Sequence, residues 1–180
     1  MSYYNAVTLA KFYATAAHSS IQQRRKYTGD PYIVHPTRVA ITVVRYGGDA
    51  NMQCAAYLHD VVEDTGVTIV DIQDMFGVEI AQIVDGLTDV SLPTDGYRAV
   101  RKAIDREHSA NASYAAQFVK CADIIDNSSD ISENDLKFAA VYRKEMTALL
   151  AVLDKVIDTP IWTAAVNSVL AMPYDNKENL

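Results

Sequence analysis

Apolar residues recur three and four positions apart along most of this chain, a spacing typical of α-helices that pack one face on a core. Between Ala6 and Ala17 they follow this rule throughout, which predicts a first helix over about 4–22. Glycine and proline divide the rest of the pattern into segments of helical length. We therefore predict an all-α, single-domain helical bundle over residues 1–172, followed by a polar tail over 173–180.

Local signals set the ends of the other predicted helices. Thr68 with Asp71 resembles a capping box, and Gly77 follows as a stop signal. Thr159 is a candidate cap, with Pro160 at the first helical position. Helices are expected over about 36–46, 51–60, 68–76, 78–87, 97–107, 113–127, 132–157 and 160–171.

The composition argues against several classes of function. A net charge of −7 over 180 residues disfavours a general nucleic-acid binder, which needs a basic face. The apolar runs are too short for a membrane span, and the N-terminus shows no secretory signal. The two cysteines, Cys54 and Cys121, lie far apart and form no redox or metal motif. We expect a cytoplasmic protein with both thiols reduced and buried.

Candidate metal ligands are arranged around one adjacent His-Asp pair. His59 and Asp60 form the pair, His35 stands upstream before a proline, and Asp123 lies downstream. Two imidazoles and two carboxylates can hold one divalent metal ion. Mixed nitrogen and oxygen ligands suit manganese, iron, zinc or nickel better than calcium. One ion is expected, because the other two histidines fall outside this pattern.

Two further carboxylates follow the pair by one helical turn. On a continuing helix, Glu63 and Asp64 would lie beside the ion and could orient and deprotonate an attacking water. The ion would polarise a phosphate group and lower the pKa of the water. This pattern predicts hydrolysis of a phosphate ester. The alternative is that the two acids are only the charged end of a helix.

The order of these motifs resembles the HD phosphohydrolase superfamily, which is named for the adjacent pair. Sequence blocks over 22–26, 31–36, 58–65, 76–84 and 120–127 are similar to the hydrolase domain of RelA/SpoT proteins. They are most similar to its stand-alone form, the small alarmone hydrolase called the metazoan SpoT homologue. The resemblance spans about 10–130. The chain ends where a RelA/SpoT synthetase domain would begin, so it resembles a hydrolase-only form.

This resemblance implies an HD-type helical bundle, a bound manganese ion and a nucleotide substrate. The expected reaction removes the 3′-pyrophosphate from guanosine 3′,5′-bis(diphosphate) and related alarmones. In the resembled hydrolases, Glu63 and Asp64 correspond to the water-activating pair. Arg25 and Lys26 correspond to residues that bind the base and phosphate, and Asn127 to a residue near the ribose.

Two positions depart from the resembled pattern, and three others have a second interpretation. Tyr32 lies in a loop and is a candidate substrate-binding residue at the mouth of the cleft, although a tyrosine in such a loop is more often structural. Many family members carry basic residues where this chain has Ile124 and Ser129, so these two positions call into question how tightly it binds a long polyphosphate. The basic cluster that includes Arg25 and Lys26, expected to close the first helix, could also be a solvated helix end.

Two other functions stay open at this stage. One is an HD phosphohydrolase that acts on another phosphorylated nucleotide, such as a nucleoside monophosphate or NADPH. The other is a non-catalytic nucleotide-binding module with a residual metal site, although the Glu63–Asp64 pair argues against it. The sequence leaves the oligomeric state open.

Overall fold

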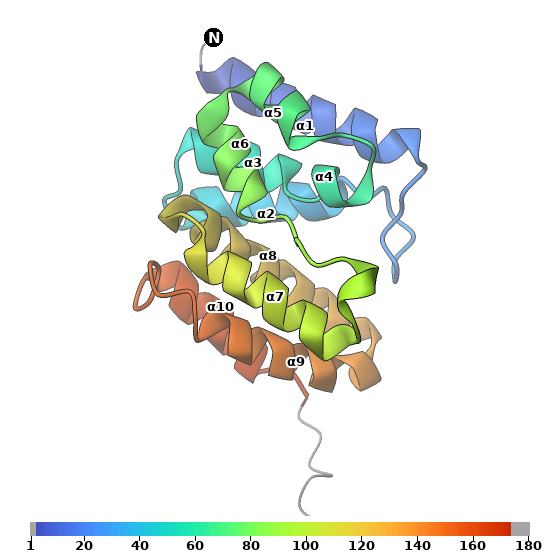
Figure 1. Cartoon of the computed structure of the whole chain (residues 1–180), viewed down its shortest axis with the longest axis vertical. Coiled ribbons are helices and arrows are strands. Elements are labelled where there is room, and N and C mark those ends of the chain that lie inside the picture. Colours follow the sequence, from blue (N-terminus) through green and yellow to red (C-terminus); the bar gives the residue numbers. More distant parts are fainter. Residues whose placement is uncertain (1–2, 174–180) are drawn as a thin grey trace, which may run out of the picture.

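The computed structural model describes residues 3–173, and these residues form helices joined by loops, the longest of which precede Val34 and Arg98 (Figure 1). The all-α prediction is confirmed. The only β pairing in the described part is an isolated bridge between Arg24 and Pro31. The helices are α1 (Tyr3–Ser20), α2 (Val34–Arg45), α3 (Ala50–Leu58), α4 (Val61–Asp64), α5 (Ile69–Phe76), α6 (Val78–Asp85), α7 (Arg98–Asn111), α8 (Tyr114–Asn134), α9 (Leu136–Leu150) and α10 (Pro160–Leu170), with a 3-10 turn at Pro93–Asp95.

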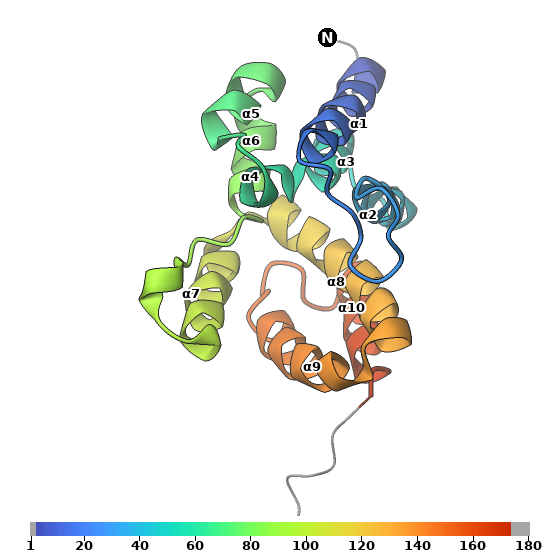
Figure 2. The same cartoon turned by 90° about the vertical axis from the view of Figure 1, so that its right-hand side faces the viewer.

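Helix α8 lies at the centre of the arrangement. It contacts α2, α3, α6, α7, α9 and α10, while α1 packs on α3 and α5 packs on α6 (Figures 1 and 2). Its buried face includes Phe118, Val119 and Ala122, which belong to the main hydrophobic core. Side chains on the other faces of α8 can therefore reach several neighbouring helices. None of the described helices combines the length and apolar character needed to cross a membrane.

Two of the predicted caps are present. The Thr68 hydroxyl accepts from the backbone N–H of Asp71, and the Asp71 carboxylate accepts from the N–H of Thr68. Thr159 accepts from the N–H of Trp162, with Pro160 at the first helical position. These local bonds satisfy N–H groups that have no partner inside the helix.

The first helix ends earlier than predicted. It stops at Ser20, because Gln22 adopts a left-handed backbone conformation with φ of 55°. Arg25 and Lys26 therefore lie in the loop between α1 and α2 and do not close a helix. The prediction that they do was wrong.

The helix predicted over about 132–157 is also wrong at both ends. Helix α8 continues to Asn134, and Asp135 breaks the path and caps α9 by accepting from the N–H of Phe138. At the other end α9 stops at Leu150, and the N–H of Lys155 donates to the Gln117 side chain on α8. The polar tail predicted over 173–180 lies, apart from Pro173, outside the described residues.

The His-Asp pair lies at a junction between two helices. Helix α3 ends at Leu58, and α4 begins at Val61. His59 and Asp60 are the two residues between them, so the helix predicted over about 51–60 ends two residues earlier, and Glu63 and Asp64 lie on a separate short helix. Because α3 packs on α2 and α8, this junction faces both of those helices.

Candidate active site

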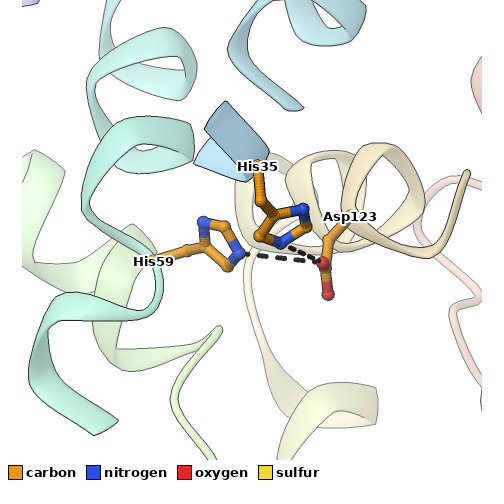
Figure 3. A group of neighbouring side chains, drawn as sticks. All are labelled: His35, His59 and Asp123. Carbon is orange, nitrogen blue, oxygen red and sulfur yellow. Dashed lines mark ion pairs between the residues drawn. The ribbon is translucent and has the colours of Figure 1, made fainter. Parts of the chain in front are cut away.

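Three predicted ligands converge from separate parts of the fold. His35 lies on α2, His59 follows α3, and Asp123 lies on α8 (Figure 3). Asp123 Oδ1 is 3.2 Å from His35 Nε2 and 3.7 Å from His59 Nε2. One potential ligand atom from each residue lies within 4.8 Å of the others. That spacing is small enough for all three to contact one ion.

Asp60, the fourth predicted ligand, lies beside this group of three. Its Oδ2 lies 3.1 Å from His59 Nε2 and 3.6 Å from His35 Nε2. The same oxygen accepts a 2.7 Å hydrogen bond from the hydroxyl of Tyr32. Tyr32 therefore orients the Asp60 carboxylate, which gives this tyrosine a role that the sequence did not predict.

The second nitrogen of each imidazole is fixed by another group. His59 Nδ1 donates to the backbone oxygen of Ala56 at 2.9 Å, and His35 Nδ1 donates to Asp126 Oδ2 at 2.6 Å. Arg38 Nε also donates to Asp126, at 2.7 Å. A carboxylate or carbonyl behind a histidine is a common way to orient a metal ligand. Sequence reasoning missed Asp126, although its position three residues after Asp123 places both on one side of α8.

The buried atoms of this cluster fit a divalent cation. His59 Nε2 is buried, makes no hydrogen bond among the described residues and faces two carboxylates. Burial lowers the pKa of His59, but Asp60 and Asp123 outweigh it and hold the pKa well above its usual value. The neighbouring carboxylates thus favour a second proton on His59. A cation bound here would take the place of that proton, since two nitrogens and two carboxylates form a suitable ligand set.

A cavity of about 200 Å³ opens beside the cluster. Tyr32, His35, Asp60 and Asp123 form the part of its lining nearest the proposed ligands. Helices α7, α8 and α9 supply other walls, and these include Lys102, Arg106, Lys120, Tyr142 and Met146. The space is thus bounded by charged groups and by a partly apolar wall on α9.

Glu63 and Asp64 face different surroundings. Glu63 lines the cavity, and its Oε1 accepts a 2.6 Å hydrogen bond from the N–H of Asp89. Burial of the Glu63 carboxyl group in the cavity wall raises its pKa to about 7, although the positive charge of nearby Lys120 lowers this pKa. Asp64 is not part of the cavity lining, and its Oδ2 accepts a 2.8 Å bond from Gln23 Nε2.

Gln23 is itself held by His18. Because the amide nitrogen of Gln23 donates to a carboxylate, its oxygen faces His18 Nδ1, which donates to it at 2.7 Å. The His18 side chain is only 1% exposed and lies beside the Tyr32 ring. His18, one of the two histidines outside the predicted ligand pattern, is packed, and it orients the amide that contacts Asp64.

The predicted substrate-binding residues are distributed unevenly. Asn127 lines the cavity and donates to Asp123 Oδ1 at 2.7 Å. Arg25 lies behind it, where its guanidinium forms a 2.5 Å ion pair with Asp130. Lys26 is 71% exposed, forms a 3.2 Å ion pair with Asp135 and does not line the cavity.

Of the two departures from the resembled pattern, one is buried. The side chain of Ile124 is 1% exposed and belongs to the hydrophobic core, so it does not reach the cavity. Ser129 on the exposed side of α8 donates to Glu133. Cationic side chains in the cavity wall come instead from Lys102, Arg106 and Lys120. Sequence analysis gave none of these three a role.

Residues 10–122 of this chain match the HD domain family. The match includes His35 and the His59–Asp60 pair, and it ends one residue before Asp123. The chain belongs to the HD-domain family. Its members share the adjacent His-Asp pair that the structure places at the junction of α3 and α4.

This HD-domain chain is similar to several proteins of known name. It is 40% identical over 121 residues to the zebrafish guanosine-3′,5′-bis(diphosphate) 3′-pyrophosphohydrolase MESH1, covering 65% of each chain. It is 29% identical over 151 residues to a probable guanosine-3′,5′-bis(diphosphate) 3′-pyrophosphohydrolase of Mycoplasma pneumoniae, covering 79% of this chain and 20% of the relative. The chain thus spans less than two thirds of the length of these curated relatives.

A solved structure is similar over most of both chains. It belongs to a metazoan orthologue of SpoT described as hydrolysing ppGpp and acting in starvation responses. The TM-score is 0.79 at 26% identity, and the alignment covers 92% of this chain and 93% of that one. A structure from Listeria monocytogenes matches with a TM-score of 0.64 at 25% identity, over 79% of this chain and 98% of that one. The predicted HD-type bundle is therefore confirmed.

Proposed function

We propose that this HD-domain protein is a metal-dependent hydrolase that removes the 3′-pyrophosphate from guanosine 3′,5′-bis(diphosphate)-type nucleotides. The observation that carries the proposal is the position of Glu63 on a cavity that also contains His35, Asp60 and Asp123. A carboxylate that can accept a proton thus lies beside a candidate metal centre. The names of the similar proteins support the choice of substrate.

His35, His59, Asp60 and Asp123 would hold one divalent ion, and we propose manganese. Mixed nitrogen and oxygen ligands suit manganese, iron, zinc and nickel, and the resemblance to RelA/SpoT hydrolases favours manganese among these. When bound, the ion supplies electrophilic polarisation of the phosphate and lowers the pKa of a neighbouring water. Asp126 and the Ala56 carbonyl keep the two imidazoles oriented with Nε2 toward the centre.

Glu63 acts as the proton acceptor in the proposed reaction. A water oxygen forms a bond to the phosphorus next to the ribose 3′-oxygen, and its proton passes to Glu63. The bond between that phosphorus and the 3′-oxygen breaks, and the 3′-oxygen takes up a proton from solvent, which releases pyrophosphate and leaves the nucleoside 5′-diphosphate with a 3′-hydroxyl. The Asp89 N–H holds Glu63 by one oxygen, so the carboxylate has a defined direction before substrate arrives.

Asp64 is the second member of the proposed catalytic pair. Its carboxylate is held by Gln23, and we propose that this contact keeps the α4 segment aligned beside Glu63. Among the binding residues, Asn127 and Tyr32 support contact with the nucleotide, because both line the cavity. Arg25 supports the nucleotide site indirectly, because its guanidinium lies 3.4 Å from the side-chain oxygen of Asn127. Lys26 would contact the nucleotide from the rim of the site only after its ion pair with Asp135 breaks.

The test is a nucleotide panel with manganese, in which products are separated by chromatography. We expect pyrophosphate and guanosine 5′-diphosphate from guanosine 3′,5′-bis(diphosphate). Nucleoside monophosphates and NADPH serve as competing substrates. A higher kcat/KM for release of orthophosphate from either would overturn the alarmone assignment. No turnover of any nucleotide by metal-loaded protein would favour a binding module.

A further inference from the structure

Arg106 is a cavity-lining cation whose charge is not neutralised by a neighbouring group. It lies on α7, and its guanidinium makes no hydrogen bond or ion pair with any residue that the structure describes. The other cavity cations differ. Lys102 Nζ is 2.5 Å from Asp89, and Lys120 Nζ donates to the Leu87 carbonyl at 3.0 Å.

The nearby carboxylates are already engaged by other groups. Asp105 accepts from the backbone N–H groups of Val90 and Ser91 and from the Ser91 hydroxyl. Glu145, across the cavity on α9, accepts two hydrogen bonds from Arg98, at 2.7 and 2.8 Å. The acids around Arg106 therefore have partners of their own, and the guanidinium remains available to an anion that enters the cavity.

A chain of contacts along the cavity wall connects Glu63, the proposed proton acceptor, to the part of α7 that carries Arg106. Glu63 bonds the N–H of Asp89, and the Asp89 carboxylate pairs with Lys102. Arg106 follows Lys102 by four residues, so it lies about 6 Å further along α7. The wall thus runs from the proposed proton acceptor to Arg106 without leaving the cavity.

A second polar group accompanies Arg106. Ser109 lies three residues later on the same side of α7, and it also lines the cavity. Its carbonyl oxygen accepts from Gln117 Nε2, while its hydroxyl has no partner among the residues described. A guanidinium and a hydroxyl in this arrangement suit the oxygens of a phosphate group, which a planar guanidinium binds in a bidentate manner.

We propose that Arg106 and Ser109 form an anion subsite that holds the 5′-diphosphate of the nucleotide while its 3′-diphosphate lies at the His-Asp centre. This inference rests on the proposed function and names the part of the substrate that α7 recognises. Arg25 and Lys26 are paired with Asp130 and Asp135, so Arg106 is the cation best placed for this role. The 5′-phosphates would then set substrate preference through α7.

The experiment compares Arg106→Gln with the unmodified protein on two manganese-supported substrates. One is guanosine 3′,5′-bis(diphosphate), and the other is guanosine 3′-diphosphate, which has a 5′-hydroxyl. For the bis(diphosphate), loss of a charge-assisted contact should raise KM about 10- to 100-fold with little change in kcat. For the 5′-hydroxyl compound the two proteins should agree within about threefold. Arg45→Gln, an exposed arginine on α2, is the matched control and should behave as the unmodified protein.

Binding measurements separate this inference from the proposed function. Glu63→Gln and the double variant Glu63→Gln/Arg106→Gln are titrated with both nucleotides by calorimetry. The subsite predicts about 10- to 100-fold weaker binding of the bis(diphosphate) alone in the double variant. Equal losses for both nucleotides, or no loss for either, would overturn the subsite. Absence of turnover in the unmodified protein would overturn the proposed function, whatever the calorimetry shows.

Discussion

Glu63 combines access to the cavity with a pKa raised to about 7. Only its ionised form can accept a proton, so kcat/KM should rise as pH increases toward and through about 7. A cation in the His-Asp centre favours the carboxylate and moves this rise to lower pH. The measurement is a pH profile of manganese-supported hydrolysis.

Glu63→Gln keeps the shape of the side chain and removes the proton acceptor. Turnover should fall by roughly a hundredfold or more, and the remaining activity should lose its rise with pH. Metal content should stay the same by elemental analysis, because Glu63 is not among the proposed ligands. Full activity in this variant would show that another group takes the proton.

Gln23 gives a separate test of the water-activating pair. Its side chain makes one hydrogen bond to His18 and one to Asp64. Gln23→Ala releases the Asp64 carboxylate, and we expect kcat to fall about 10- to 100-fold, the effect of losing a hydrogen bond to a charged group. KM and metal content should change little. Gln73→Ala, an exposed glutamine on α5, should have no effect on kcat. An equally slow Gln73→Ala protein would contradict this role.

The proposed metal ligands could be predicted from sequence, whereas the residues that support them could not. His35, His59, Asp60 and Asp123 stand in a recognisable order, and the structure brings them together. The groups behind them depend on packing between helices far apart in the chain. Asp126, for example, meets His35 only because α8 packs on α2.

At the scale of helices, prediction succeeded where the signal was local. The caps at Thr68 and Thr159 depend on residues within one turn, and both were found. The end of α9 was missed because a contact across the fold contributes to it. The N–H of Lys155 donates to Gln117, which lies on α8 and also bonds the carbonyls of Ser109 and Ala110.

Gln117 therefore joins the end of α7 to the segment after α9, and its side chain is fully buried. Gln117→Leu keeps a similar volume and removes the side-chain partner of the Ala110 carbonyl and of the Lys155 N–H. The Ser109 carbonyl keeps its bond from the Ala112 N–H. Each such buried group costs about 1–3 kcal/mol, so the free energy of unfolding should fall by about 2–4 kcal/mol. Urea denaturation measures this change. Gln82→Leu, at an exposed position of α6, is the control and should differ little from the unmodified protein.

Across the whole molecule, the proposed ion would connect parts of the chain that are distant in sequence. Its ligands come from α2, from the junction of α3 and α4, and from the central helix α8 (Figure 1). These residues are not assembled in an unfolded chain, so a cation should bind the folded state far more tightly. Metal binding should therefore stabilise the entire fold and not only the active site.

The corresponding prediction concerns thermal stability. At an ion concentration about 100 times the dissociation constant, binding adds about 2.7 kcal/mol, which should raise Tm by about 5–10 °C for a protein of this size. The measurement compares chelator-treated protein before and after manganese is added. Calcium should give little shift, because it prefers a shell of oxygen ligands.

His59→Ala should abolish the manganese shift. His108→Ala should retain it, because that histidine on α7 bonds the Asp85 carbonyl away from the centre. Equal manganese shifts in both variants would mean that the ion binds elsewhere.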